Sequence, residues 1–398
     1  MKAVIFAAGK STRTYPLTLT RPKPLLPVAN RPILAHQFDA LRGIVDGVIV
    51  VVGYRADMIR ARFGTACDGL PIEYVEQKDQ RGTGHALQQC EGALRGSFLT
   101  LNGDDLYAHD DLAALAAVDQ GGLARTVEDP RQFGVYEVDS GGHAVRIVEK
   151  PKNPVSKLAN IGAYKFSPDV FACLRNVKPS ERGEIEITSA IQMLADRRAF
   201  RVVESKGHWL PIGYPWDLLG ATQFILDTFL KPEIHGEVSP AAHLSGAIAI
   251  GHGTVIRPGV VIDGPVIIGE NCNIGPNAWI RPYSAIGNGC KIGQGSEIKG
   301  SILMDGAAVP HLSYAGDSIL GEKVNFGCGT ITANFRHDGG NHKSMVKGEL
   351  VDTGRRKLGA IVGDGVHTGI NTSIYPGRKL WPGTGTLPGE VVQRDKEV

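Results

Sequence analysis

Two hydrophobic patterns follow one another along the chain. In the first part, short runs rich in Val, Ile and Phe alternate with segments of helical periodicity. The runs predict strands at KAVIFAA (2–8), GVIVVVG (47–53), GSFLTLNGD (96–104) and RVVESKG (201–207), and the periodic segments predict helices at 33–43, 82–94 and 216–230. This alternation predicts an α/β domain with a mainly parallel sheet, in which ligands bind beyond the carboxyl ends of the strands.

The second part repeats every six residues. The positions that carry the repeat are Ile250, Ile256, Ile262, Ile268, Ile274, Ile280, Ile286, Ile292 and Ile298. An unbroken hexad is typical of a parallel β-helix, in which three hexads close one triangular coil and residues three hexads apart stack at roughly 4.8 Å. The isoleucines would fill the interior. Cys272 and Cys290 are also three hexads apart, so we expect them to stack as small corner residues.

The repeat is interrupted twice. It breaks after Met304, resumes at Leu320 and Phe326, and breaks again before Val362. The interrupting segments are PHLSYAGDSI (310–319) and ANFRHDGGNHKSMVKGELVDTGRRKLGA (333–360). Because segments expelled from a regular solenoid usually carry function, both are predicted to be functional loops.

Charge and cysteine content narrow the class of protein. The 398 residues carry a formal net charge of +2 with acids and bases nearly balanced, which argues against a nucleic-acid partner. The six cysteines are scattered without a CxxC pair, so neither a zinc site nor a disulfide framework is indicated. No run approaches the roughly 20 apolar residues of a membrane span. The sequence therefore predicts a soluble, cytoplasmic protein without a membrane partner.

The stretch after the first predicted strand is built for an anion. Gly9 would let the backbone approach a ligand closely, and N–H groups at the start of the next helix could face phosphate oxygens. Arg13 and Lys23 add full positive charges, although solvated surface charge alone would also explain a lone arginine. The combination predicts a ligand with several negative charges.

The pattern AAGKSTR…P.T..RPKPLLP resembles the fingerprint of sugar-1-phosphate nucleotidylyltransferases. Seven segments agree with that family in order and spacing over residues 1 to about 228, although Ser11 replaces the family's usual second glycine. The resemblance implies nucleotide binding by Ala7, Ala8, Gly9, Gln77, Gly82 and Thr83. Gln77 would pair with the edge of a uracil or thymine, so UTP and dTTP both remain open.

The same resemblance implies the catalytic and sugar-binding residues. Asp104 in LNGDDLY and Asp217 in YPWDLLGA match the two carboxylates that hold Mg²⁺, although a turn or helix-cap role is the alternative for each. Arg13 would stabilise charge on the leaving pyrophosphate, and Lys23 would brace the α-phosphate or the attacking sugar phosphate. The implied contacts to the sugar phosphate are Gly134, Glu149, Lys150 and Asn160.

The second half resembles the left-handed β-helix of bifunctional N-acetylglucosamine-1-phosphate uridyltransferase/glucosamine-1-phosphate acetyltransferases, and fits the long archaeal-type members best. The resemblance implies that Arg281 and Lys299 grip the sugar phosphate and that His311 is the general base for an amine that attacks acetyl-CoA. The implied contacts around the sugar and acetyl group are Tyr314, Asn325 and Asn334. The alternative for His311 is a plain loop histidine.

The expected organisation is a nucleotidyltransferase domain at 1–228, a linker at 229–245 and a β-helix acyltransferase-like domain at 246–398. The predicted function is a two-activity enzyme that acts on a nucleoside triphosphate, a sugar-1-phosphate and acetyl-CoA. The alternative is a nucleotidylyltransferase whose β-helix only assembles subunits or binds regulators. A scaffold without catalysis would not need Arg13, Lys23, Asp104 and Asp217. Because related solenoid enzymes form trimers, a homotrimer is expected.

Overall fold

The computed structural model describes residues 1–180 and 182–397, which form two compact units. The first unit comprises Met1–Lys10, Pro22–Leu25 and Ile33–Pro211, and the second comprises Ser11–Arg21, Leu26–Pro32 and Ile212–Val398. The hydrophobic pattern predicted the two architectures. It did not predict that the segment carrying Arg13 groups with the second unit.

The first unit is built on a mixed sheet whose central strands are parallel. Its strand order is β11 (Ala144–Glu149), β10 (Gly134–Val138), β12 (Leu158–Phe166), β7 (Phe98–Asn102), β1 (Lys2–Ala7), β4 (Gly47–Val52), β6 (Leu70–Glu76) and β5 (Ala66–Cys67). Strands β7, β1, β4 and β6 run parallel, while β12 and β5 pair antiparallel at either side. Strand β9 (Gly121–Thr126) pairs with β12 and with β13 (Arg201–Glu204). The expected Rossmann-like domain is confirmed.

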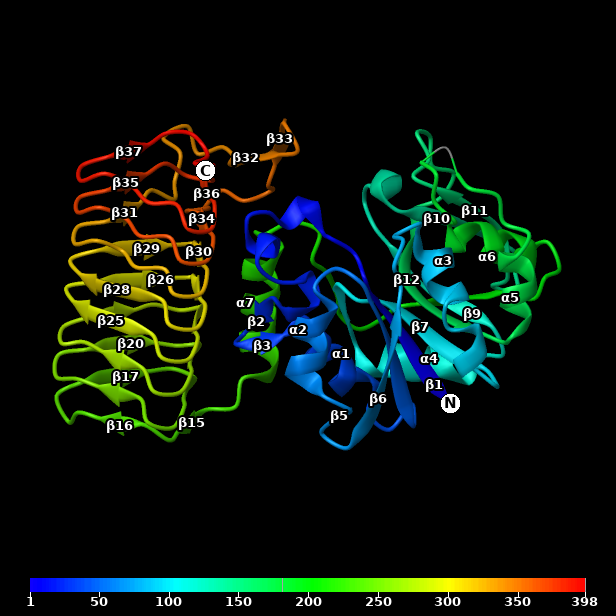
Figure 1. Ribbon diagram of the computed structural model, residues 1–398, viewed down its shortest axis with the longest axis horizontal. Helices are drawn as coiled ribbons and strands as arrows, with labels where there is room; N and C mark the ends of the chain where they lie inside the picture. The colour runs from blue at the N-terminus through cyan, green and yellow to red at the C-terminus, as the bar shows by residue number, and fades with distance from the viewer. Residues whose placement is uncertain (181, 398) are drawn as a thin grey trace. The chain divides into compact units, whose positions relative to one another are not determined.

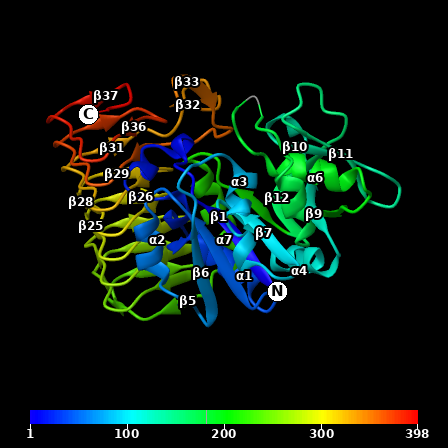
Figure 2. The same ribbon diagram turned by 45° about the vertical axis from the view of Figure 1, so that its right-hand side comes forward.

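Helices cover both faces of this sheet, as the strand–helix alternation predicted. Successive β1 residues face opposite sides: Ala3 and Ile5 belong to the core under one set of helices, and Val4 belongs to the core under the other. The first set is α1 (Ile33–Leu41), α2 (Ala56–Phe63) and α4 (His109–Ala117). The second set is α3 (Thr83–Gln88), α5 (Asp169–Leu174) and α6 (Ile187–Ala195), of which α3 and α6 are labelled in Figure 2. A sheet buried on both faces presents only its strand ends to ligands.

The second unit contains α7 (Asp217–Phe229) and a parallel β-helix of three stacked sheets (Figure 1). The first sheet is β15 (Glu233–Ile234), β18 (Ile248–Ile250), β21 (Val266–Ile268), β24 (Ser284–Ile286), β27 (Ile302–Leu303), β30 (Ile319–Leu320), β34 (Ile361–Val362) and β36 (Lys379–Leu380). The second is β16 (Glu237–Val238), β19 (Val255–Ile256), β22 (Asn273–Ile274), β25 (Lys291–Gln294) and β28 (Ala308–His311). The third is β17 (His243–Ser245), β20 (Val261–Asp263), β23 (Trp279–Ile280), β26 (Glu297–Lys299), β29 (Tyr314–Gly316), β31 (Ile331–Thr332), β35 (Ser373–Ile374) and β37 (Val391–Val392).

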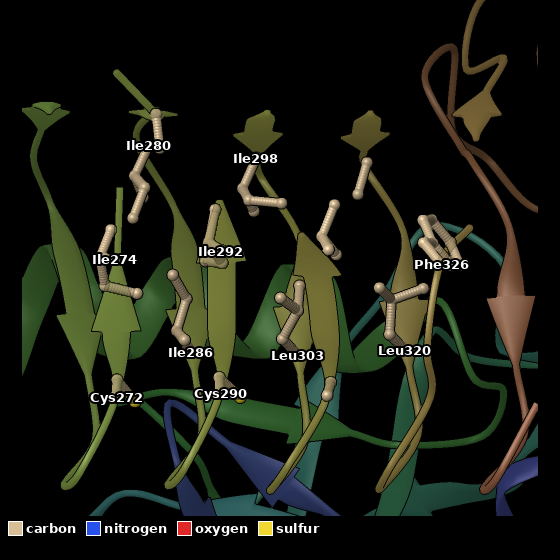
Figure 3. Close-up of a cluster of buried hydrophobic side chains, with 14 of the residues drawn as sticks. Cys272, Ile274, Ile280, Ile286, Cys290, Ile292, Ile298, Leu303, Leu320 and Phe326 are labelled. Atoms are coloured by element: carbon tan, nitrogen blue, oxygen red, sulfur yellow. The ribbon is translucent and has the colours of Figure 1, made fainter. Parts of the chain in front are cut away.

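The isoleucines of the hexad fill the interior of this β-helix. Ile274, Ile280 and Ile286 come from the three different sheets and are fully buried together (Figure 3). Cys272 and Cys290 occupy equivalent buried positions on neighbouring coils, as expected. Glycine is required where the coils approach most closely, since a Cβ on Gly293 would lie 1.8 Å from the carbonyl oxygen of Pro310. The six-residue period of the isoleucines thus arises because successive hexads place one buried isoleucine on each of the three sheets in turn.

One of the two predicted insertions is not expelled from the solenoid. Segment 310–319 contributes strands β28 and β29 to two of the sheets. Ile286 pairs with Leu303 and Ile298 pairs with Ala315, so the coil is shortened by one residue and the hexad loses its phase without a loop leaving the stack. The second insertion is real, because Ile319 pairs directly with Ile361 in the next coil. It carries the hairpin of β32 (Lys343–Val346) and β33 (Glu349–Asp352).

A buried lysine gives the β-helix a pH-dependent stability. Lys379 is 2% exposed, its Nζ donates to the carbonyl oxygen of Met345 at 2.5 Å, and burial lowers its pKa to about 8, opposed in part by Asp395. An unfolded lysine titrates at about 10.4, so between pH 8 and 10 Lys379 binds fewer protons in the folded chain than in the unfolded chain. The contribution of Lys379 to the free energy of unfolding therefore rises with pH across this window.

We expect the melting temperature of the wild type to rise relative to that of Lys379→Met between pH 8 and pH 10. The shift corresponds to a contribution of up to about 3 kcal/mol. Calorimetry of both proteins at the two pH values measures it. Parallel pH dependences for the two proteins would contradict the assignment.

Candidate functional site

The first group of predicted residues lies where parallel strands of the first unit end. β1 ends at Ala7, and the carbonyl oxygen of Ala8 accepts hydrogen bonds from the Gln80 side chain at 2.7 Å and the Tyr54 backbone N–H at 3.0 Å. A Cβ on Gly53 would lie only 2.9 Å from the same oxygen, so glycine allows the close approach. The loop that carries the predicted phosphate contacts is thereby held against the loops that follow β4 and β6.

The predicted base-reading residues also lie together. Gln77 is 4% exposed, and its Nε2 donates to the carbonyl oxygen of Gly82 at 3.1 Å. Gly82 has a φ of 97°, and a Cβ there would lie 2.7 Å from the carbonyl oxygen of Ile185, so only glycine fits. Thr83 begins α3 directly after it. His85, which sequence reasoning did not single out, places Nδ1 3.0 Å from the same Gln77 nitrogen.

Lys23 and Asp104 form a partly buried ion pair in the first unit. Lys23 is 3% exposed, and its Nζ donates to Oδ2 of Asp104 at 2.7 Å. Asp104 lies in the turn between β7 and β8 (Asp105–Tyr107), and its side chain is 38% exposed. Asp104 therefore occupies a turn position, and its role as a metal ligand stays a prediction. Its carboxylate nevertheless faces solvent with a fixed orientation.

The neighbouring Asp105 is a residue that sequence reasoning missed. Its Oδ2 accepts hydrogen bonds from the Tyr107 hydroxyl at 3.2 Å and from Nε1 of Trp209 at 3.3 Å. Burial, reinforced by the charge of Asp104, raises the pKa of Asp105 to about 7. The signal for Asp105 in the sequence was that NGDD contains two consecutive aspartates. Of the two adjacent carboxyl groups, only that of Asp104 is exposed enough to meet a ligand.

In the second unit, Arg13 and Asp217 are both held near the start of α7. The Arg13 guanidinium lies 5.5 Å from the ring centroid of Tyr214, which stacks on Trp216 at 4.8 Å. Oδ2 of Asp217 accepts hydrogen bonds from the backbone N–H groups of Gly213 at 2.8 Å and Tyr214 at 2.7 Å. Because Gly213 and Tyr214 precede α7, Oδ2 of Asp217 holds the turn that leads into the helix.

The predicted sugar-phosphate residues converge in the first unit. A Cβ on Gly134 would lie 3.2 Å from Oε2 of Glu149 and 3.3 Å from Nδ2 of Asn160, so the absent side chain leaves room between them. Nδ2 of Asn160 donates to the Tyr164 hydroxyl at 2.7 Å. Burial raises the pKa of Glu149, opposed in part by the charge of Lys150. The structure thus brings together all four residues that the resemblance implied.

A second group of predicted residues lies on the β-helix. Nζ of Lys299 donates to Oδ2 of Asp317 at 2.7 Å, and Nδ2 of Asn334 donates to the same oxygen at 2.5 Å and to the Tyr314 hydroxyl at 3.0 Å. Burial raises the pKa of Tyr314. Sequence reasoning missed Asp317, although it is the one acidic residue in the segment YAGDSI. This carboxylate joins three predicted residues into one network.

Arg281, which directly follows β23, and His311 lie elsewhere on the same β-helix. The Arg281 guanidinium donates to Glu297 at 2.8 Å and lies 4.6 Å from the ring centroid of Trp279. His311 ends β28, is exposed, and its imidazole makes no hydrogen bond to any residue that the structure describes. Asn325 follows in the same column, where it bridges to Ala308. An exposed imidazole is accessible to a bound ligand, and an imidazole nitrogen in its neutral form can accept a proton.

A divalent cation fits the residues of the first group. Over residues 1–180 and 182–397, no three His, Cys, Asp or Glu side chains are grouped so as to hold a metal ion by themselves. Mg²⁺ in phosphate-handling sites keeps several waters and takes only one or two carboxylates. The partly exposed Asp104 suits that mode of binding.

Among the helices within residues 1–180 and 182–397, none has the length and apolar content needed to cross a lipid bilayer.

Family comparisons match both units. The family model described as nucleotidyl transferase matches residues 2–228, and the model described as the GMPPB C-terminal domain matches residues 262–378. A relative from Methanococcus maripaludis, named bifunctional protein GlmU, is 41% identical over 400 residues, covering 100% of this chain and 95% of its own. A relative from Sulfurisphaera tokodaii, named bifunctional sugar-1-phosphate nucleotidylyltransferase/acetyltransferase, is 37% identical and covers 99% and 98%.

Two further proteins match the chain only in part. A glucose-1-phosphate thymidylyltransferase from Streptomyces griseus is 35% identical over 65% of this chain and 75% of its own. A solved structure of UDP-glucose pyrophosphorylase complexed with UDP-glucose superimposes with a TM-score of 0.53 at 25% identity, covering 57% of this chain and 98% of its own. The two relatives with bifunctional names therefore match the chain from end to end, whereas the relatives named for nucleotide transfer alone match part of it.

Proposed function

The chain belongs to the nucleotidyl transferase family, and we propose that it is a bifunctional enzyme that acetylates an amino-sugar-1-phosphate and then activates it with a nucleotide. The first reaction uses acetyl-CoA, and the second uses UTP or dTTP and releases pyrophosphate. The observation that carries the proposal is the full-length match to bifunctional relatives, together with a polar network on the β-helix that a purely structural solenoid does not need.

Nucleotide transfer requires that two polyanions meet. A phosphate oxygen of the sugar-1-phosphate attacks the α-phosphorus of the nucleoside triphosphate, and pyrophosphate leaves. Mg²⁺, for which we propose Asp104 and Asp217 as ligands, would supply charge neutralisation at the phosphates. Lys23, held by Asp104, would brace the α-phosphate or the attacking phosphate, and Arg13 would stabilise charge on the leaving group. No protein nucleophile is needed, because the attacking phosphate is already ionised.

Residues of the first unit would position the two substrates. The loop of Ala7, Ala8 and Gly9 would contact the phosphates, and Gln77 with Gly82 and Thr83 would receive the base. The sugar phosphate would bind at the cluster Gly134, Glu149, Lys150 and Asn160. Support comes from the way each set is already assembled: the Gly134 gap opens between Glu149 and Asn160, and the Gln77 amide is fixed by hydrogen bonds.

Acetyl transfer would take place on the β-helix. His311 would remove a proton from the sugar amine, which then attacks the thioester carbon of acetyl-CoA and releases the CoA thiol. Arg281 and Lys299 would bind the sugar phosphate. Tyr314, Asn325 and Asn334 would contact the sugar and the acetyl group. The network around Asp317 supports this reading, because it orients Lys299 and Asn334 toward a common point beside Tyr314.

The assembly and location of the enzyme follow as further proposals. We expect a trimer, because the flat faces of a triangular solenoid are suited to packing against copies of themselves, and a stable monomer in light scattering would overturn this.

The six cysteines described are all free thiols, in keeping with a reducing cytoplasm. The division at 1–228, 229–245 and 246–398 is likewise retained as a proposal.

A substrate matrix tests the proposed function. Glucose-1-phosphate, glucosamine-1-phosphate and N-acetylglucosamine-1-phosphate are each incubated with UTP or dTTP, with and without acetyl-CoA. We expect glucosamine-1-phosphate to yield a nucleotide acetamido sugar only when acetyl-CoA is present. Pyrophosphate release without any release of CoA thiol would instead favour a nucleotidylyltransferase whose β-helix serves assembly or regulation.

A further inference from the structure

We propose that His85 determines which atom of Gln77 faces the nucleotide base, and thereby restricts the enzyme to pyrimidine bases that carry an imide N–H. The inference rests on the proposed nucleotidyl transfer and deepens it. It concerns His85, which follows Gln77 by eight residues in the chain and contacts the side chain that is predicted to contact the base.

The orientation of the Gln77 amide is set first by a backbone group. The atom 3.1 Å from the carbonyl oxygen of Gly82 must be the amide nitrogen, because a carbonyl oxygen can only accept. This identifies the two ends of the amide without reference to any titratable or ambiguous side chain. Gly82 is itself confined by its φ of 97° and by the carbonyl of Ile185, so the acceptor does not move away easily.

His85 then takes the second hydrogen of the same nitrogen. Its Nδ1 lies 3.0 Å from Nε2 of Gln77, and since the amide nitrogen can only donate, Nδ1 must accept. The imidazole is therefore neutral and carries its proton on Nε2. The atom of Gln89 that lies 3.3 Å from this second ring nitrogen is its amide nitrogen, which also donates to the His85 carbonyl oxygen at 3.3 Å. Because an amide nitrogen cannot accept from a protonated Nε2, the exposed Gln89 side chain must turn its oxygen toward the ring when Nε2 carries the proton.

With both hydrogens engaged, Gln77 has only Oε1 left to offer. No residue among those that the structure describes donates a hydrogen bond to this oxygen, and the side chain as a whole is 4% exposed. Uracil and thymine present an N3–H donor on their pairing edge, whereas cytosine presents a lone pair at N3. A fixed acceptor in a buried site accepts the first two and repels the third.

Removing the acceptor at position 85 leaves the amide with one anchor in place of two. The Gln77 side chain can then turn and present its NH₂ group to the base, which relaxes the choice between uracil and cytosine. One lost hydrogen bond of about 1.4 kcal/mol corresponds to a tenfold change. We therefore expect the ratio of kcat/KM for UTP to kcat/KM for CTP to fall about tenfold in His85→Leu.

The test compares this variant with two matched controls. In His85→Asn, the amide oxygen can occupy the place of Nδ1, so we expect the UTP/CTP ratio to recover to within about threefold of the wild-type value. His109→Leu removes an exposed histidine from α4 in the same unit and should leave the ratio unchanged. All four proteins are assayed by pyrophosphate release with UTP, dTTP and CTP.

The outcomes separate this inference from the proposed function. A wild type that uses no pyrimidine nucleoside triphosphate overturns the proposed function itself. A wild type that uses UTP or dTTP, with an unchanged UTP/CTP ratio in His85→Leu, overturns only the role of His85. Nitrogen NMR of the labelled wild type provides a readout that needs no variant: we expect an unprotonated Nδ1 at His85, and a proton on that atom would refute the proposal.

Discussion

Replacing Asp104 by asparagine abolishes nucleotidyl transfer while the fold persists: we expect kcat/KM to fall by about 10³-fold or more. The carboxylate of Asp104 is the exposed member of the Asp104–Asp105 pair, and it also holds Nζ of Lys23 at 2.7 Å. The asparagine oxygen can still accept the Lys23 hydrogen bond, so the loss of stability should stay near 1–2 kcal/mol. What is lost is the negative charge that a hard divalent cation requires.

Pyrophosphate release at saturating Mg²⁺ measures this prediction. Asp110→Asn is a matched control, because Asp110 is an exposed acid in the first turn of α4 and takes no part in the proposed chemistry. Acetyl transfer by the Asp104→Asn protein should stay close to normal, which shows that the chain is folded. Near-normal pyrophosphate release by this variant would refute the role of Asp104.

Replacing His311 by alanine should remove acetyl transfer and spare nucleotidyl transfer. Loss of a general base typically costs about 10²- to 10⁴-fold in rate. The imidazole of His311 is exposed and has no hydrogen-bond partner among the described residues, so its removal leaves no buried polar group unsatisfied and should barely affect stability. The effect should therefore appear in kcat for the acetyl step without a change in melting temperature.

Release of the CoA thiol from acetyl-CoA, with glucosamine-1-phosphate as acceptor, measures the acetyl step. His337→Ala is the matched control, since His337 is an exposed histidine of the nearby insertion that is given no role in either reaction. Equal thiol release by the wild type and His311→Ala would exclude His311 as the base. Loss of activity in His337→Ala as well would point to a general effect of the insertion.

Much of the fold could be predicted from the sequence because strands and β-helix coils each produce a characteristic local pattern of apolar residues. A strand buried on both faces needs a continuous apolar run, and the first six residues of GVIVVVG became β4 (Gly47–Val52), all of them buried. A β-helix needs one inward isoleucine per hexad, and those isoleucines are the interior of the solenoid. Periodicity failed at 310–319, where a coil one residue shorter shifted the phase of the pattern and was mistaken for an expelled loop. Only the strand pairing could show that the stack continues.

The sequence by itself determined which residue types could carry the chemistry, because motifs place them at fixed offsets from strand ends and coil corners. The tertiary structure alone decided which carboxylate is exposed and which is buried in the Asp104–Asp105 pair, and that Asp317 joins Lys299 to Asn334. It also decided that His85 shares the Gln77 nitrogen with Gly82. Burial and hydrogen-bond geometry depend on segments far apart in the chain, and no local pattern encodes them.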